Sequence, residues 1–448
     1  MSVNGFLLDP PGCENNPVLP IKIPVEGHVI SAHRVGLGLW HESASLELEF
    51  TRLLPPETPP IEIHARVLLV ENAREEVKKG VIHGIRATDT PQGTISSRLK
   101  YMPSLHLYPD PVLLGYKLLF PLFPEPEIYL PTGTDLELEL SQPAPLPPDL
   151  SLPATSPPKG DLQELAEKLA ELPERTFTPK GKEADVVNFI FSGSDAQLEQ
   201  AFTAAGWKQS DRVSRRSVRH SLHAFLVRNS YPTAPMSPQE FENRASELTF
   251  EKTFDSYEKR DHLRLWSLPP GQYREPLWAG AAVRETGATL SIKNRGFIHH
   301  VSPNLTDEQQ IVVRDLLAVD CVDSVGAIAR PEMGHILLNA TGEIFRTDGT
   351  LTVVYLRPCA ANPQPSDLHT GVNYHPGSKL FRMARKWILT VRSDLWRANI
   401  LYGGFDLTRN TVQALRRNSL HRANLELYHQ SSQSSEVVEL PAMSPPSQ

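Results

Sequence analysis

The chain has 448 residues, of which 40% are hydrophobic and 22% charged, so most of it can bury a core. At roughly 100–200 residues per domain, this length predicts about two to three domains. Lys and Arg total 45 against 52 Asp and Glu, a net charge of −7 that argues against a nucleic-acid partner. Three cysteines cannot form a disulfide framework, and the longest apolar stretch, residues 112–123, is too short to cross a bilayer.

Residues 1–20 lack the basic end and apolar core of a secretory signal peptide. Two interpretations of this start remain open. The chain is either a cytoplasmic protein without a leader, or its start is cut short.

Residues 20–141 predict an all-β domain, either barrel-like or a sandwich. Most of the 41 prolines lie in the first 180 residues, which disfavours helices there. Leu136, Leu138 and Leu140 alternate with Glu137 and Glu139, the pattern of a strand with one wet face. Residues 45–50 and 61–70 show the same period of two.

Residues 142–184 predict a Pro-rich linker that contains one short helix. Prolines crowd residues 143–158, which indicates an extended and fairly stiff segment. Leu162, Leu165, Leu169 and Leu172 then recur at helical spacing before Pro173. Because so short a helix is marginal in water, we expect it to dock on its own chain or on a partner.

From residue 185 the pattern changes to alternating strands and helices, and residues 185–360 predict an α+β domain. Residues 186–191 form a short apolar strand pattern. The turn at 192–195 can cap a helix over 196–205, and Gly206 stands where glycine ends helices. The whole chain is therefore predicted to be α+β.

Six segments in this part resemble the LssY carboxy-terminal domain family: NFIFSGS at 188–194, AFTAAGW at 201–207, YPTAP at 231–235, HLRLW at 262–266, PLWAGAA at 276–282 and HHVSP at 299–303. The resemblance implies a bacterial origin and a soluble domain that is often attached to membrane or envelope modules. It implies no established activity. Thr306 and Gln309 stand where the family usually has an acidic residue and an Arg, and residues 306–309 read as a helix capping box.

Histidines form the first candidate site. His262, His299 and His300, with oxygen ligands from Asp307 or Glu308, could hold a divalent metal or act as acid and base. Adjacent residues of a strand point to opposite faces, so only one of His299 and His300 can join His262. The chain contains no His-Glu-x-x-His motif. Hydrogen-bonded structural histidines are the alternative, and a metal is left open without being favoured.

Aromatic and arginine side chains form the second candidate. Arg264, Trp266, Trp278 and Arg284 could line a ligand or peptide groove, since Arg stacks on tryptophan and binds anions. Buried core tryptophans are the alternative.

Residues 361–425 predict a basic amphipathic helical extension, followed by a disordered tail at 426–448. The candidate membrane or partner surface on this extension consists of Arg382, Arg385, Lys386, Trp387 and Arg392. Packing on the chain's own domain is the alternative. Cys321 and Cys359 could be apolar filler or a disulfide.

Two functions follow from these patterns. The first is a binding or scaffolding protein of the bacterial cell envelope, whose protein partner or membrane surface is met by the basic extension. The second is a metal-dependent hydrolase of an anionic, phosphate-containing substrate, with Arg264 holding the substrate's charge.

Overall fold

The computed structural model of the chain describes residues 1–8, 23–37, 41–55, 59–71, 74–86, 89–90, 124–130, 134–144, 162–254, 257–269, 273, 275–291, 296–359 and 378–397, with single positions between 408 and 426. The Pro-rich part of the predicted linker and the predicted disordered tail after residue 426 lie outside this part.

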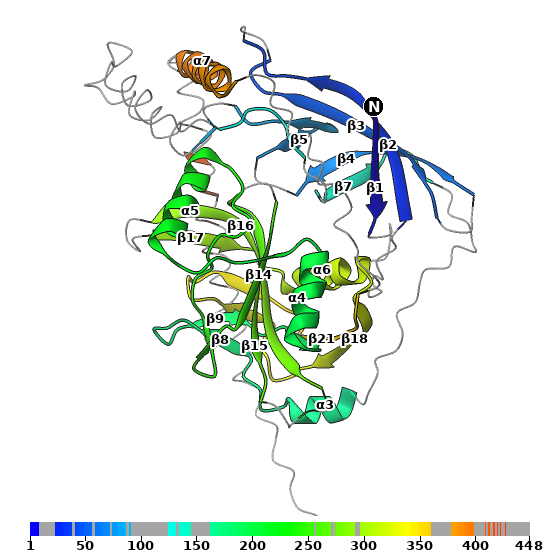
Figure 1. Cartoon of the computed structure of the whole chain (residues 1–448), viewed down its shortest axis with the longest axis vertical. Helices are drawn as coiled ribbons and strands as arrows, with labels where there is room; N and C mark the ends of the chain where they lie inside the picture. Colours follow the sequence, from blue (N-terminus) through cyan, green and yellow to red (C-terminus); the bar gives the residue numbers. More distant parts are fainter. Residues whose placement is uncertain are drawn as a thin grey trace, which may run out of the picture.

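The amino-terminal part forms one antiparallel sheet, half of the expected barrel (Figure 1). Its order is β1-β2-β3-β4-β7, with the hairpin β5–β6 attached to β3. The strands are β1 (Ser2–Leu7), β2 (Ile23–His33), β3 (Ser45–Leu53), β4 (Ile61–Val70), β5 (Glu76–Lys78), β6 (Val81–His83) and β7 (Leu136–Leu140).

The period of two in the sequence orients this sheet. On β4, Ile61, Ile63, Ala65 and Val67 are buried while the residues between them are exposed. Buried positions of β2, β3 and β6 pack against them in one core. The prediction of a β-rich amino-terminal domain is confirmed.

The carboxy-terminal part is built on an eight-stranded mixed sheet of order β11-β14-β15-β16-β10-β21-β18, with β17 added to β16. Among the strands of this sheet that the structure describes, only β10 and β21 pair in parallel. The strands are β10 (Phe189–Ser192), β11 (Lys208–Gln209), β14 (Leu248–Thr253), β15 (Arg260–Ser267), β16 (Leu277–Ser291), β17 (Gly296–Val301), β18 (Val322–Ala329) and β21 (Thr350–Leu356).

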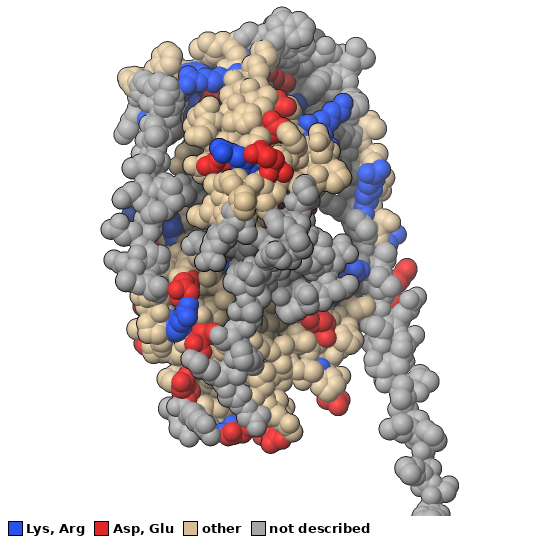
Figure 2. Space-filling model, turned by 90° about the vertical axis from the view of Figure 1, so that its right-hand side faces the viewer, with Lys and Arg blue, Asp and Glu red and all other residues tan. Residues whose placement is uncertain are grey.

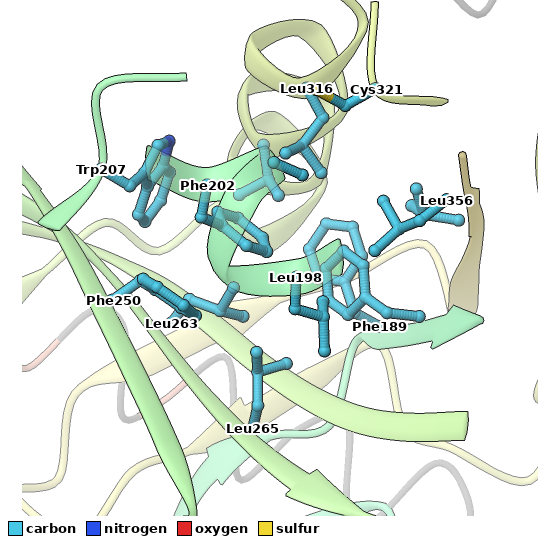
Figure 3. Packing of buried hydrophobic residues seen from close by; sticks show 14 of the residues in the cluster. Phe189, Leu198, Phe202, Trp207, Phe250, Leu263, Leu265, Leu316, Cys321 and Leu356 are labelled. Carbon is cyan, nitrogen blue, oxygen red and sulfur yellow. The ribbon is translucent and has the colours of Figure 1, made fainter. Parts of the chain in front are cut away.

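One face of this sheet, here called the helical face, is covered by α4 (Asp195–Ala204) and α6 (Leu305–Ala318). Figure 3 shows Leu198 and Phe202 of α4 reaching toward Phe250 and Leu263 of the sheet. The rings of Phe202 and Phe250 stack with centroids 4.9 Å apart. These contacts form the main core.

Capping residues fix where these two helices begin. The turn at 192–195 caps α4, as the sequence predicts, and Ser194 does so through a capping box with Gln197. The predicted box at residues 306–309 is wrong, because Asn304 caps α6 and its side chain accepts from the Thr306 N–H. Thr306 therefore lies inside the helix, and Gln309 donates to the carbonyls of Asn188 and Thr350.

The other face, here called the sheet face, is covered by a four-stranded sheet of order β13-β12-β8-β9, by α5 (Arg215–Val227) and by α3 (Leu162–Lys168). The small strands are β8 (Arg175–Phe177), β9 (Glu183–Val186), β12 (Glu240–Phe241) and β13 (Arg244–Ala245). Leucines of α3 pack beside β18 and on the same core as Trp266, so the predicted short helix docks on its own chain. A hairpin of β19 (Ile336–Leu338) and β20 (Ile344–Arg346) completes the α+β fold.

Cys321 and Cys359 form a disulfide with their Cα atoms 4.2 Å apart. Cys321 precedes β18 and Cys359 follows β21, so the bond joins the ends of two neighbouring strands. Within the described part of the chain, no helix is long and apolar enough to span a bilayer.

Candidate functional site

Buried ionisable residues gather at the sheet face of β14, β15 and β16. Arg260 and His262 alternate on β15 and so point to the same side. The strand register brings Glu251 opposite His262 and Glu285 opposite Arg260. His299, from β17, reaches the carboxylate of Glu285. These five residues are here called the Glu285 cluster: Glu251, Arg260, His262, Glu285 and His299.

Glu285 is the centre of this cluster. Its carboxylate lies 2.9 Å from Nη2 of Arg260, 3.1 Å from Nδ1 of His262 and 2.7 Å from Nδ1 of His299. Arg260 also donates to Glu251 at 3.1 Å and lies over the Tyr257 ring.

The two carboxyl groups differ in charge although both are buried. Burial alone would raise the pKa of Glu285, but Arg260, His262 and His299 together hold it well below its usual range. Burial raises the pKa of Glu251 well above its usual range, with Arg260 only partly opposing this. Burial also lowers the pKa of His262, against the pull of Glu285. The pKa shifts thus favour the ionised form of Glu285 and the neutral forms of Glu251 and His262.

These contacts do not suit a metal ion. Both imidazoles direct Nδ1 at the carboxylate of Glu285 at hydrogen-bond distance, and that carboxylate is also held by Arg260. Metal ligands must instead converge on one point about 2.0–2.2 Å away. Among the residues that the structure describes, no group of three or more His, Cys, Asp or Glu side chains is arranged to hold a metal.

The predicted oxygen ligands lie elsewhere. Glu308 is buried on the helical face, where Nε of Arg284 lies 3.6 Å from it and 2.8 Å from Asp261. Burial raises the pKa of Glu308 well above its usual range, and the adjacent Asp261 adds to this. Asp307 is exposed on the first turn of α6. The structure therefore separates both acids from His262.

His300 points away from the Glu285 cluster, as the alternation of a strand predicts. Its Nδ1 lies 2.6 Å from Glu343 of the β19–β20 hairpin. The same carboxylate accepts from the Val301 N–H at 2.9 Å. This pair ties β17 to the hairpin.

The proposed aromatic groove is not assembled either. Arg264 donates to Asp185 at 2.8 Å, and Trp266 is fully buried with its indole N–H on the Arg244 carbonyl. Trp278 packs in the main core on the helical face and donates to the Gly193 carbonyl. These side chains are core elements on two faces of one sheet.

The basic extension forms α7 (Lys379–Arg397) and docks on the amino-terminal sheet domain. Arg385 donates to Glu127 at 2.6 Å, and Lys386 lies 2.9 Å from Glu125. Arg392 donates to the carbonyls of Gly36 and Glu42. Beneath these bases, Leu389 of α7 is buried against Val35 and Ala44. Three of the predicted surface bases are therefore used inside the molecule.

The opposite side of α7 is apolar and exposed. The exposed fractions are 74% for Leu380, 63% for Phe381, 50% for Met383 and 46% for Ile388. Ala384 lies between Leu380 and Ile388 on the same line of the helix and is also exposed. We call these five residues the α7 stripe. Trp387 and Arg382 are half-buried beside it.

Sequence reasoning identified the histidines but not their partners. Glu251, Arg260 and Glu285 carry no motif, and each contacts residues on a neighbouring strand. One available signal was the alternation of Arg260, His262 and Arg264, which puts three basic residue types on one face of a strand.

Comparison with known proteins places the carboxy-terminal part. No curated protein and no solved structure matches the chain. Residues 169–351, which begin within the predicted linker and include the Glu285 cluster, match the family described as LssY C-terminus. This part of the chain is therefore an LssY C-terminal domain.

Proposed function

We propose that the chain is a binding protein of the bacterial cell envelope that attaches to a membrane surface through α7. The α7 stripe is the observation that carries this proposal. Interfacial helices bury one apolar face, rich in Leu and aromatic residues, at the boundary between headgroups and acyl chains.

The docking of α7 determines which face is available. Arg385, Lys386 and Arg392 hold the basic face against the amino-terminal domain, with Leu389 buried beneath them. The three bases do not lie on the outward face, which carries the α7 stripe. Contact with lipid would therefore bury the apolar side chains of the stripe without removing water from the three bases.

The disulfide between Cys321 and Cys359 supports the envelope as the compartment. Disulfides persist in oxidising compartments such as the bacterial periplasm and are rare in the cytosol. The metal-dependent hydrolase remains the alternative, but the contacts of His262 and His299 with Glu285 give it no support.

Vesicle flotation of the full chain tests this function. The wild type is expected to float with phosphatidylcholine vesicles. The variant Phe381→Asp/Ile388→Asp should lose at least about tenfold in binding, since burying two such side chains contributes about 1.5–3 kcal/mol each. Leu68→Asp, an exposed apolar position on β4, is the matched control and should bind like the wild type. Equal binding by the stripe variant, or no flotation of the wild type, would overturn the proposal.

A further inference from the structure

Helix α5 of the LssY C-terminal domain exposes an unusual concentration of arginine. Arg212, Arg215, Arg216 and Arg219 are all exposed, while Asp211 is the one acidic residue between 211 and 223. Within the described part of the chain, none of the four guanidinium groups forms an ion pair or hydrogen bond. This local charge contrasts with the net −7 of the whole protein.

The position of these arginines works against the stability of the helix. Backbone N–H groups give the first turn of a helix a partial positive charge, so cations there are unfavourable. The first turn of α5 holds Arg215 and Arg216 and no acidic residue. The carboxylate of Asp211 is already used, since it accepts from Tyr231 and Thr233.

Packing of the inner side of α5 turns the four arginines toward solvent. Ala224 and Phe225 are buried in a small core with Tyr257, whose ring meets that of Phe225 edge-on. Ser214 and Ser217 form a capping box that sets the start of the helix. The rotation of α5 is therefore determined by packing and not by its charged side chains.

Aliphatic side chains are interleaved with the arginines. Val213 is 59% exposed, Val218 50% and Leu222 40%. Val218 and Leu222 lie four residues apart on one line of the helix, next to Arg215 and Arg219. A mixed basic and aliphatic face of this kind matches a surface that offers anionic groups above an apolar layer.

We propose that this α5 face, made of the four arginines with Val218 and Leu222, binds anionic lipid headgroups at the membrane surface. The inference rests on the proposed membrane attachment and adds to it the lipid class. Guanidinium groups bind phosphate oxygens in bidentate geometry, and each base near an anionic surface contributes about 1 kcal/mol. The aliphatic side chains would enter the headgroup layer between the arginines.

The two contacts lie toward one side of the molecule. Figure 1 places α5 at the left of the carboxy-terminal domain and α7 at the upper left. Figure 2 looks from the opposite side, and there Lys and Arg are interspersed with Asp and Glu over the described surface. The described part of that surface thus mixes both signs of charge, unlike the outer side of α5.

The test compares two pairs of substitutions that remove equal charge. Arg215→Gln/Arg219→Gln removes two bases from α5, and Lys180→Gln/Lys182→Gln removes two exposed bases from a turn of the same domain. Flotation is measured with phosphatidylcholine vesicles and with mixed phosphatidylcholine–phosphatidylglycerol vesicles. The arginine variant should keep the binding to phosphatidylcholine and lose about 25-fold in the additional affinity that phosphatidylglycerol gives. The lysine variant should keep both.

The outcomes separate this inference from the role of α7. If the α7 stripe variant loses binding to phosphatidylcholine but still binds better when phosphatidylglycerol is added, the result supports α7 as the apolar contact. The same result supports a separate site for anionic lipid, and the arginine variant shows whether α5 is that site. A phosphatidylglycerol effect in the wild type that the arginine variant loses supports α5 even when phosphatidylcholine alone is not bound. An unchanged phosphatidylglycerol effect in the arginine variant, an equal loss in the lysine variant, or an arginine-dependent affinity for duplex DNA alone would overturn the inference.

Discussion

Glu251 and Glu285 are buried on the two strands that flank β15 and both contact Arg260, yet the pKa of Glu285 is lowered and that of Glu251 is raised. The difference follows from the number of donors. Glu285 has Arg260 and two imidazoles around it, whereas Glu251 has Arg260 and lies 3.7 Å from His262. The rise in pKa that burial causes is therefore outweighed at Glu285 but not at Glu251.

Removing the charge of Glu285 should destabilise the domain strongly. Glu285→Gln leaves Arg260 buried without its main counter-charge, which costs about 3–5 kcal/mol at pH 7. Urea unfolding measures this loss. Glu139→Gln, which breaks the exposed pair with Arg66, is the control and should cost no more than about 1 kcal/mol. Similar losses for both variants would contradict the role of Glu285 as the centre of the cluster.

Glu251→Gln should raise the free energy of unfolding instead of lowering it, and the gain should depend on pH. The pKa of Glu251 is raised in the folded state, so the wild type loses stability as pH rises from the unfolded pKa through the raised value. Gln imitates the protonated acid and removes this loss. The variant should match the wild type near about pH 4.5 and exceed it near about pH 8, as followed by urea midpoints. Parallel pH curves would show that Glu251 is ionised in the fold.

At the scale of the element, α7 shows how amphipathic patterns are ambiguous. The sequence pattern identifies a basic amphipathic helix, and α7 is that helix. It does not tell which face is inward, because that depends on Glu125 and Glu127, about 260 residues earlier in the chain. Basic residues that looked like a free surface are held by these acids.

Leu389 is the apolar anchor of this docking. Leu389→Ala should cost about 2–5 kcal/mol of the docking energy, because the side chain is fully buried against Val35 and Ala44. Hydrogen exchange should become faster in α7 and stay unchanged in α4. Ala384→Ser, on the exposed side, is the control. Exchange that accelerates in both helices would indicate global unfolding instead of local release.

The fold was predictable where the signal is local. Alternation places the strands of the amino-terminal sheet, and the turn at 192–195 identifies the start of α4. The start of α6 was missed by two residues because Asn304 and Thr306 both suit a cap, and packing decides between them. The partners of the histidines were not predictable, since cross-strand register brings Glu251 and Glu285 to them.

At the scale of the whole molecule, acids of the amino-terminal sheet meet bases of the LssY C-terminal domain. Asp135 lies 3.1 Å from Nη2 of Arg314 and 3.5 Å from Nζ of Lys252. Glu71 lies 3.5 Å from Arg284. Although the sequence predicts a stiff linker between the two parts, they are in direct contact.

Asp135→Asn tests this contact. Burial alone would raise the pKa of Asp135, but Lys252 and Arg314 hold it below its usual value. Its contribution is therefore present above the unfolded pKa, near about 3.9, and is lost as pH falls through the lowered value. The variant should lose about 1–3 kcal/mol at pH 7 and show a larger radius of gyration in solution scattering. Asp307→Asn, at an exposed position on the first turn of α6, is the control. An unchanged radius and melting temperature would show that the two parts do not depend on this contact.

The single parallel pair in the carboxy-terminal sheet has a consequence for the order of folding. Phe189 of β10 pairs with Thr352 of β21, and β10 lies in the sheet between β16 and β21. During synthesis, β10 therefore exposes an open edge until the chain has been extended through residue 356. The family match stops at residue 351, inside β21 (Thr350–Leu356), so a fragment cut at that limit would lack five of the seven residues of this strand, including all four that pair with β10. Such a long sequence separation slows folding, and an open central edge invites aggregation of the nascent chain.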